Sequence, residues 1–124
     1  MTAEMFCRRV LIVEDEGMVA MLLEDMLTDL GHEVVATIGQ MDRAAELVAE
    51  AAIDVAVLDV NLNGEHTYSL ATVLKARGVP FIFATGYGIA GLNEEWRSAP
   101  VLQKPFQARD LKRVMREVFE TRAG

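Results

Sequence analysis

The sequence has few of the residues that mark disulfide-rich or membrane-spanning proteins. Among its 124 residues there are one cysteine, three prolines and one tryptophan. The single cysteine, Cys7, excludes an internal disulfide framework and is typical of cytosolic proteins. No apolar run approaches the roughly 20 residues that cross a bilayer. Residues 1–9 lack the apolar core of a signal peptide. We therefore predict a cytoplasmic protein that does not enter a membrane.

Positive charge is also scarce. The chain carries 12 Lys and Arg against 19 Asp and Glu, which gives a formal net charge of -7. An acidic domain repels the phosphates of nucleic acid, so we expect no nucleic-acid partner. Apolar residues make up 52% of the sequence and charged residues 25%, as in folded domains. The length suits one domain, and we expect residues 1–124 to form it without an output domain.

Short apolar runs alternate with segments of helical periodicity. The runs predict five strands, at residues 8–13, 33–38, 54–58, 81–84 and 99–102. Apolar residues at helical spacing predict four helices, of which the third lies at about residues 66–76 and the last at 107–121. Residues 61–65 are expected to form a polar loop. The alternation predicts an α/β fold, a doubly wound parallel sheet with helices on both faces.

The stretch between the fourth and fifth predicted strands is the least regular. Residues 86–98 contain Gly86, Gly88 and Gly91, and glycine disfavours helix formation. Only residues 93–97 fit a helical turn. We therefore expect the helix that would follow the fourth strand to be short or mobile.

Polar residues follow four of the predicted strands. They are Glu14 and Asp15 after the first strand, Asp59 after the third, Thr85 after the fourth and Lys104 after the fifth. The carboxyl ends of parallel strands meet at one edge of the sheet, where ligands bind in open α/β folds. Each acid taken alone could cap a helix. The whole set instead predicts one site.

This set of residues suits metal-assisted phosphoryl transfer. Clustered carboxylates repel one another, and Mg²⁺, which prefers oxygen ligands, relieves that repulsion. An aspartate such as Asp59 can accept a phosphoryl group as a nucleophile. Lys104 can neutralise the phosphoryl oxygens, and Thr85 can donate a hydrogen bond to one of them. The residues therefore indicate Asp59 as a phosphoacceptor and Mg²⁺ as its cofactor.

In its motifs the sequence resembles the receiver domain of bacterial two-component response regulators. The motifs are Val13-Glu14-Asp15-Glu16, Leu58-Asp59, Ala84-Thr85-Gly86 and Lys104-Pro105-Phe106, in that order. The resemblance covers about residues 8–121 and implies a flavodoxin-like five-stranded sheet of order 2-1-3-4-5. It also implies a cis peptide bond before Pro105.

The resemblance assigns roles to the residues of the site. It implies that Asp59 receives the phosphoryl group from a sensor histidine kinase. It implies that Asp15, Asp59 and the backbone carbonyl of Asn61 bind Mg²⁺, while Glu14 acts mainly through a metal-bound water. Receivers usually have aspartate where this chain has Glu14, so the metal geometry is expected to differ slightly.

Two departures from the family pattern concern the events after phosphorylation. The loop after Asp59 lacks the usual Met-Pro pair, and Val101 stands where receivers usually have an aromatic switch residue. The string from Pro80 to Tyr87, PFIFATGY, resembles the FAT-GUY group of receivers, many of which stand alone and are paired with kinases of the HWE class. Tyr87, or its loop, is the possible replacement for the missing switch.

The resemblance implies a signalling protein rather than an enzyme. It would act on a downstream protein by contact, or on a phosphotransfer protein, as a monomer or weak dimer. Met18, Met21 and Met26 are expected to pack in the core or at its rim, although Met18 and Met21 could also contact the kinase.

Two other functions stay open. One is a phosphorylation-independent binding module, which the complete set of acids, Thr85 and Lys104 disfavours. The other is a haloacid-dehalogenase-like phosphohydrolase. Those enzymes have a second aspartate two residues after the nucleophile, where this chain has Asn61.

Overall fold

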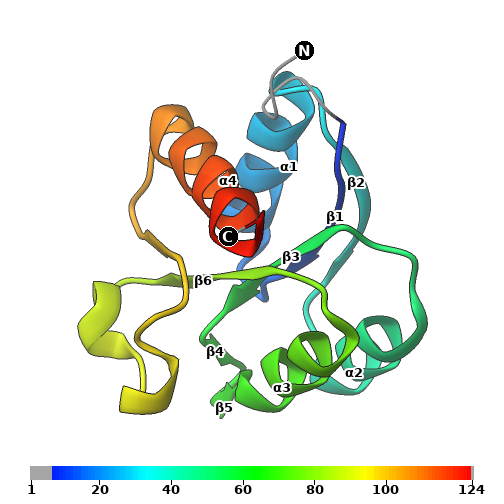
Figure 1. Ribbon diagram of the computed structural model, residues 1–124, viewed down its shortest axis with the longest axis vertical. Coiled ribbons are helices and arrows are strands. Elements are labelled where there is room, and N and C mark those ends of the chain that lie inside the picture. The colour runs from blue at the N-terminus through cyan, green and yellow to red at the C-terminus, as the bar shows by residue number, and fades with distance from the viewer. Residues whose placement is uncertain (1–6, 124) are drawn as a thin grey trace.

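A five-stranded parallel sheet lies between two layers of helices in the computed structural model, which describes residues 7–123 (Figure 1). Its strands are β1 (Arg9–Val13), β2 (Glu33–Ile38), β3 (Val55–Asp59), β6 (Phe81–Thr85) and β7 (Val101–Gln103). The strand order is β2-β1-β3-β6-β7, and every neighbouring pair is parallel. The predicted fold class and the order 2-1-3-4-5 are confirmed.

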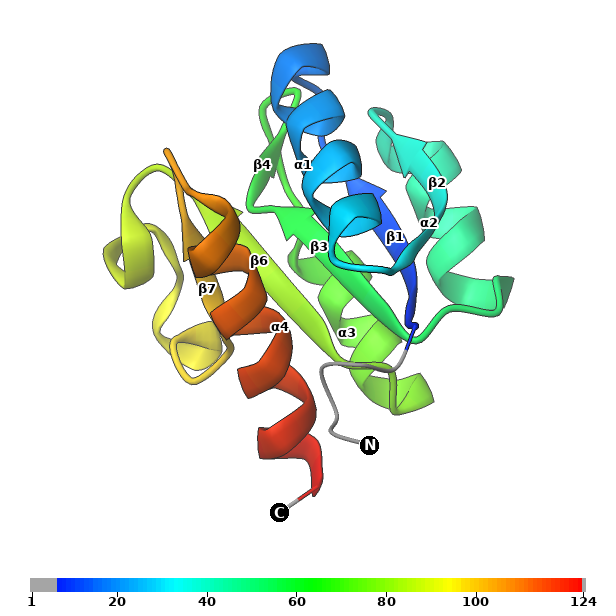
Figure 2. The same ribbon diagram turned by 90° about the horizontal axis from the view of Figure 1, so that it is seen from above.

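Helices cover both faces of the sheet. Helices α1 (Gly17–Asp29) and α4 (Ala108–Ala123) lie on one face, and α2 (Met41–Glu50) and α3 (Tyr68–Arg77) on the other (Figures 1 and 2). Within the described residues, no helix is long and apolar enough to cross a membrane.

The central strand β3 explains why an apolar run ends in a carboxylate. All five of its residues are buried. Val55 and Val57 pack in the core under α1 and α4, while Ala56 and Leu58 pack in the core under α2 and α3. Successive side chains of a strand point to opposite faces, so a strand covered on both sides is apolar throughout. Asp59 is the last residue of β3, at the edge where this covering ends.

The predicted polar loop at residues 61–65 is wrong, because this segment forms a short antiparallel hairpin. Its strands are β4 (Asn61–Leu62) and β5 (Glu65–His66). Asn63 and Gly64 between them have φ angles of 52° and 86°, the left-handed conformation that a tight hairpin turn requires. Leu62 is fully buried and ties the hairpin to the core. Helix α3 therefore begins at Tyr68 rather than at residue 66.

Two 3₁₀ turns stand where the fourth helix was expected to be short. They are η2 (Gly88–Gly91) and η3 (Glu94–Trp96). Trp96 stacks on Tyr68 of α3, with ring centroids 5.7 Å apart and an interplanar angle of 2°. The N–H of Asn93 donates to the Tyr68 hydroxyl oxygen at 2.9 Å. Aromatic packing against α3 thus holds a segment that lacks the regular backbone bonding of an α-helix.

Helix α1 turns two methionines to the solvent. Its buried residues are Ala20, Leu23 and Leu27, spaced as on one face of a helix. Met18 and Met21 lie outside that face and are 87% and 64% exposed. The predicted packing in the core or at its rim is wrong for these two residues, whereas Met26 packs against the core, partly buried.

Candidate functional site

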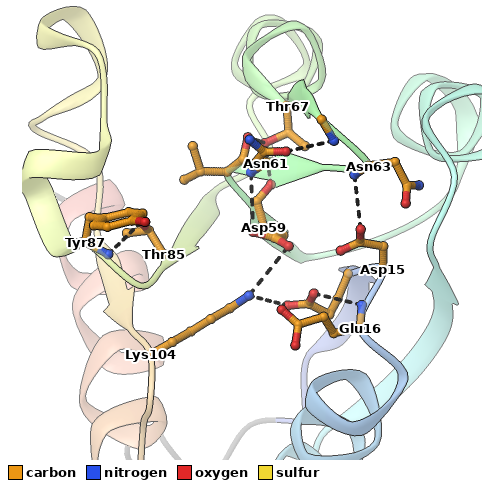
Figure 3. Close-up of polar contacts among 12 residues, drawn as sticks. Asp15, Glu16, Asp59, Asn61, Asn63, Thr67, Thr85, Tyr87 and Lys104 are labelled. Carbon is orange, nitrogen blue, oxygen red and sulfur yellow. Dashed lines mark hydrogen bonds and ion pairs between the residues drawn. The ribbon is translucent and has the colours of Figure 1, made fainter.

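The polar residues that follow the strands, which the sequence predicts to form one site, lie together at the carboxyl edge of the sheet (Figure 3). Glu14, Asp15 and Asp59 each place a carboxylate oxygen within 4.8 Å of the others. Asp15, Asp59, Thr85 and Lys104 line one cavity of about 460 Å³. The parallel pairing of β1, β3, β6 and β7 produces this gathering, because it aligns the ends of strands far apart in sequence.

A lysine bridges the two buried carboxylates. The Nζ of Lys104 lies 2.8 Å from Oε1 of Glu14 and 3.5 Å from Oδ2 of Asp59. Glu14 is only 3% exposed and Asp59 only 8%. The second oxygen of Glu14, Oε2, accepts the N–H of Glu16 at 3.1 Å. One ammonium group faces two carboxylates, with Asp15 beside them, so the cluster carries a surplus of negative charge.

The environment of Asp59 disfavours its ionised form. The pKa of Asp59 is raised from 3.8 to about 7, first by burial and then by the neighbouring Glu14, while Lys104 and the N–H of Asn61 act in the opposite direction. Burial would lower the pKa of Lys104, but Glu14 and Asp59 outweigh it, and the pKa is raised. A further positive charge at this edge would stabilise the ionised Asp59.

We expect metal-free protein to lose stability with rising pH because of Asp59. Between pH 3.8 and about 7, the folded state holds a proton on Asp59 that the unfolded state lacks, so rising pH favours unfolding. The amide side chain of the Asp59→Asn variant cannot titrate. The free energy of unfolding of the wild type should therefore fall relative to that of the variant across this interval and level off above it. Chemical denaturation in chelator at stepped pH measures the difference, and a pH-independent difference would contradict the raised pKa.

Thr85 connects the site to the segment that follows β6. It is 6% exposed, and its Oγ1 accepts the N–H of Tyr87 at 3.1 Å. A Cβ atom at Gly91 would lie 2.6 Å from the same oxygen, so a glycine is needed for η2 to pack this closely. The N–H of Lys104 donates to the Thr85 carbonyl at 2.8 Å. Tyr87 itself is 81% exposed. Thr85 therefore contacts the segment of Tyr87 and η2 through its hydroxyl, and Lys104 after β7 through its carbonyl.

Thr67 is a residue of this site that the sequence reasoning missed. It is fully buried, and its hydroxyl donates to the Asp59 carbonyl at 2.6 Å. A threonine just before a helix would normally be interpreted as an N-cap, but its side chain makes no capping hydrogen bond to α3. Thr67 instead holds the backbone at the end of β3. Thr67 reaches the Asp59 carbonyl only when the β4–β5 hairpin has formed.

The donor set fits a hard divalent cation. Glu14, Asp15 and Asp59 offer carboxylate oxygens, which Mg²⁺ prefers as ligands, and the surplus negative charge favours a cation. Asn61 lies beside them, and its N–H donates to Oδ1 of Asp59 at 3.3 Å. The Lys104–Pro105 peptide bond is cis, as expected. A role for the Asn61 carbonyl as a metal ligand stays a prediction.

Comparison with known proteins identifies the family. Residues 10–116 match the response regulator receiver domain, and the chain belongs to that family. Phosphorylation and Mg²⁺ binding at an acidic pocket are typical of receiver domains, whose role is mainly in signalling.

Solved structures and a curated relative are also similar to this chain. The solution structure of SdrG from Sphingomonas melonis Fr1 has a TM-score of 0.84 and 39% identity, over 96% of this chain and 99% of that one. The crystal structure of the response regulator PhyR from Brucella abortus has a TM-score of 0.82 and 28% identity, over 95% and 50% of the two chains. The transcriptional regulatory protein PdtaR of Mycobacterium tuberculosis is 32% identical over 84% of this chain and 53% of that protein. The chain thus spans about half the length of PdtaR.

Proposed function

We propose that this receiver accepts a phosphoryl group on Asp59 from a sensor histidine kinase, with Mg²⁺ bound by Asp15, Asp59 and the carbonyl of Asn61, and with Glu14 contributing to the metal site mainly through a metal-bound water. The observation that carries the proposal is the nearly buried Asp59 in contact with Lys104 and within reach of two further carboxylates. Mg²⁺, when bound, supplies positive charge that offsets the charge on the phosphoryl oxygens.

The transfer itself is a substitution at phosphorus. A carboxylate oxygen of Asp59 forms a bond to phosphorus, and the bond from phosphorus to the histidine nitrogen of the kinase breaks. The product is an acyl phosphate on Asp59. Lys104, whose Nζ is 3.5 Å from Oδ2 of Asp59, then pairs with a phosphoryl oxygen. The Thr85 hydroxyl donates a hydrogen bond to another phosphoryl oxygen.

The segment that carries Tyr87 replaces the aromatic switch in this proposal. Val101 in β7 pairs with Phe83 of β6 and has no ring to move. Tyr87 is bonded through its N–H to Thr85, and Gly91 of η2 packs on the same hydroxyl. A Thr85 side chain drawn toward a phosphoryl group therefore displaces both contacts, and the phosphoryl group biases the segment between two conformations.

Activation is expected to shift the amide resonances of residues 86–98, and changes at Tyr87 should reduce those shifts. The BeF₃-activated conformation of SdrG has been solved in solution. That structure matches this chain with 40% sequence identity and a TM-score of 0.76. The same phosphoryl mimic can be added to this protein and to its Tyr87→Phe and Tyr87→Ala variants. Both variants keep the Tyr87 N–H, so unchanged loop shifts in both would refute a switch role of the Tyr87 side chain, whereas loss in the alanine variant alone would assign the role to its ring.

An exposed apolar surface beside the site is the proposed contact surface for the kinase. Met18 and Met21 of α1 are exposed, and a cavity next to them is lined by Glu16, Val19, Leu22, Lys104, Pro105 and Phe106. This surface would receive the helices of the kinase, of the HWE class in our proposal. We further propose a cytoplasmic protein that passes its signal by protein contact or onward phosphotransfer.

The test is the intact mass of the protein after incubation with Mg²⁺ and a small phosphodonor such as acetyl phosphate. The proposal predicts a gain of one phosphate that chelation of the metal prevents. Steady release of phosphate from varied monoesters would instead indicate a phosphohydrolase. No gain, either from acetyl phosphate or from a panel of phosphorylated histidine kinases, would indicate a binding module.

A further inference from the structure

The tip of the β4–β5 hairpin donates one backbone N–H to the acidic cluster and a second to Asn61 beside it. The N–H of Asn63 donates to Oδ2 of Asp15 at 3.1 Å, and the N–H of Gly64 donates to Oδ1 of Asn61 at 2.9 Å. Figure 3 shows the bond from Asn63 to Asp15 beside Asp59. The N–H of Asn61 in turn donates to Oδ1 of Asp59. The hairpin thus contacts two carboxylates of the cluster and orders the side chain of Asn61.

The turn that presents these groups is fixed in place. Asn63 and Gly64 are both left-handed, with φ of 52° and 86°. The side-chain Nδ2 of Asn63 donates to the carbonyl of Gly39 at 2.8 Å. Gly39 follows β2, and a Cβ atom there would lie 3.4 Å from Cα of Asp15, so this loop packs directly on the backbone of Asp15. Residues 60–65 contain no proline, and every one of them keeps the N–H that proline lacks.

Asp15 needs such a partner because it is the exposed member of the cluster. Glu14 and Asp59 are held by burial and by Lys104. Asp15 is exposed, and a free carboxylate loses rotamer freedom when it binds a cation. A bond to one oxygen fixes the carboxylate and leaves the other oxygen for a ligand. Groups that hold metal ligands in this way are known to set metal affinity.

We infer that the Asn63–Gly64 turn is a positioning element for the cation site: it orients the Asp15 carboxylate through the Asn63 N–H, and through the Gly64 N–H it holds the side chain of Asn61, the residue whose backbone carbonyl is the proposed ligand. The inference rests on the proposed function, in which Asp15 and Asn61 bind Mg²⁺. It assigns to the hairpin a task in metal binding in addition to its packing on the core.

A matched pair of glycine variants tests the inference. Gly64→Ala and Gly31→Ala each place alanine at a positive φ, 86° and 92°, with no atom within 4 Å of the new Cβ. The two variants therefore carry a similar backbone strain, but only Gly64 lies in the hairpin. We expect Gly64→Ala to raise the dissociation constant for Mg²⁺ about tenfold and Gly31→Ala to leave it unchanged. Magnesium titration followed by amide NMR measures both.

A second variant keeps the inference testable if Gly64→Ala does not fold. Asn63→Gly accepts the positive φ and keeps the backbone N–H, but it removes the bond to Gly39. We expect it to raise the dissociation constant about fivefold, the effect of one lost hydrogen bond. Equal Mg²⁺ affinity of Asn63→Gly and the wild type, or of Gly64→Ala and Gly31→Ala, would overturn the inference.

The outcomes separate the inference from the proposed function. A wild type that binds Mg²⁺ and gains phosphate, with hairpin variants that bind Mg²⁺ equally well, refutes only the positioning role. A wild type that does not bind Mg²⁺ at all refutes the metal site of the proposed function, and with it the positioning role.

Discussion

Replacing Asp59 by asparagine is expected to abolish phosphorylation while leaving the fold intact. The amide has nearly the shape of the carboxylate, but it is a poor nucleophile and carries no charge for a cation. Thr67 donates to the Asp59 backbone carbonyl, a bond that the substitution leaves unchanged, and the amide oxygen of asparagine can still accept the N–H of Asn61. Intact mass after incubation with Mg²⁺ and acetyl phosphate should show a phosphate-sized gain in the wild type and none in the variant.

The matched control is Asp25→Asn, which removes an exposed aspartate from α1. It should gain phosphate as the wild type does, so that loss of charge alone does not explain the result. A phosphate gain that persists in Asp59→Asn would mean that another residue is the acceptor.

Replacing Lys104 by methionine should have the second largest effect, because it removes the cation between two buried carboxylates. Nζ lies 2.8 Å from Glu14 and 3.5 Å from Asp59. Without it the buried carboxylate of Glu14 has no compensating charge, and the pKa of Asp59 rises further because Lys104 no longer lowers it. We expect the metal-free protein to lose roughly 2–4 kcal/mol of unfolding free energy at neutral pH. Phosphorylation from acetyl phosphate should slow by about a hundredfold, since the charge that stabilises the transition state is missing.

Added Mg²⁺ gives this prediction a second readout. A divalent cation beside Glu14 and Asp59 restores positive charge, so Mg²⁺ should stabilise Lys104→Met more than it stabilises the wild type. Lys112→Met, at an exposed position of α4, is the control and should match the wild type in both measurements. If Lys104→Met is as stable without metal as Lys112→Met, the bridging role of Lys104 is wrong.

The sequence was sufficient to predict the sheet and the gathering of the site residues. The reason is that Asp59 and Thr85 end strands whose apolar runs are unbroken, and parallel pairing places such ends side by side. The position of a carboxylate after a buried strand is a local signal. That Asp59 lies close to Lys104 follows from the order of the parallel strands and needs no knowledge of side-chain contacts.

The features that the sequence did not predict depend on contacts between distant residues. The hairpin at residues 61–66 has strands of two residues each, too short for a periodicity to appear. Its Asn63-Gly64 pair is a known turn signal, but Leu62 is the one buried residue within the hairpin. The bond from Thr67 to Asp59 exists only once this hairpin has formed. The exposure of Met18 likewise depends on which face of α1 meets the sheet.

The most direct test of the role of Asp59 locates the phosphoryl group in the unaltered protein. Borohydride reduces an acyl phosphate on aspartate to the corresponding alcohol, so the phosphorylated wild type can be trapped, digested and sequenced by tandem mass spectrometry. We predict reduction at residue 59 alone, dependent on Mg²⁺ and on the phosphodonor. Reduction at Asp15, Glu14 or any other position, or a phosphate gain without a reducible acyl phosphate, would contradict the assignment of Asp59 as the phosphoacceptor.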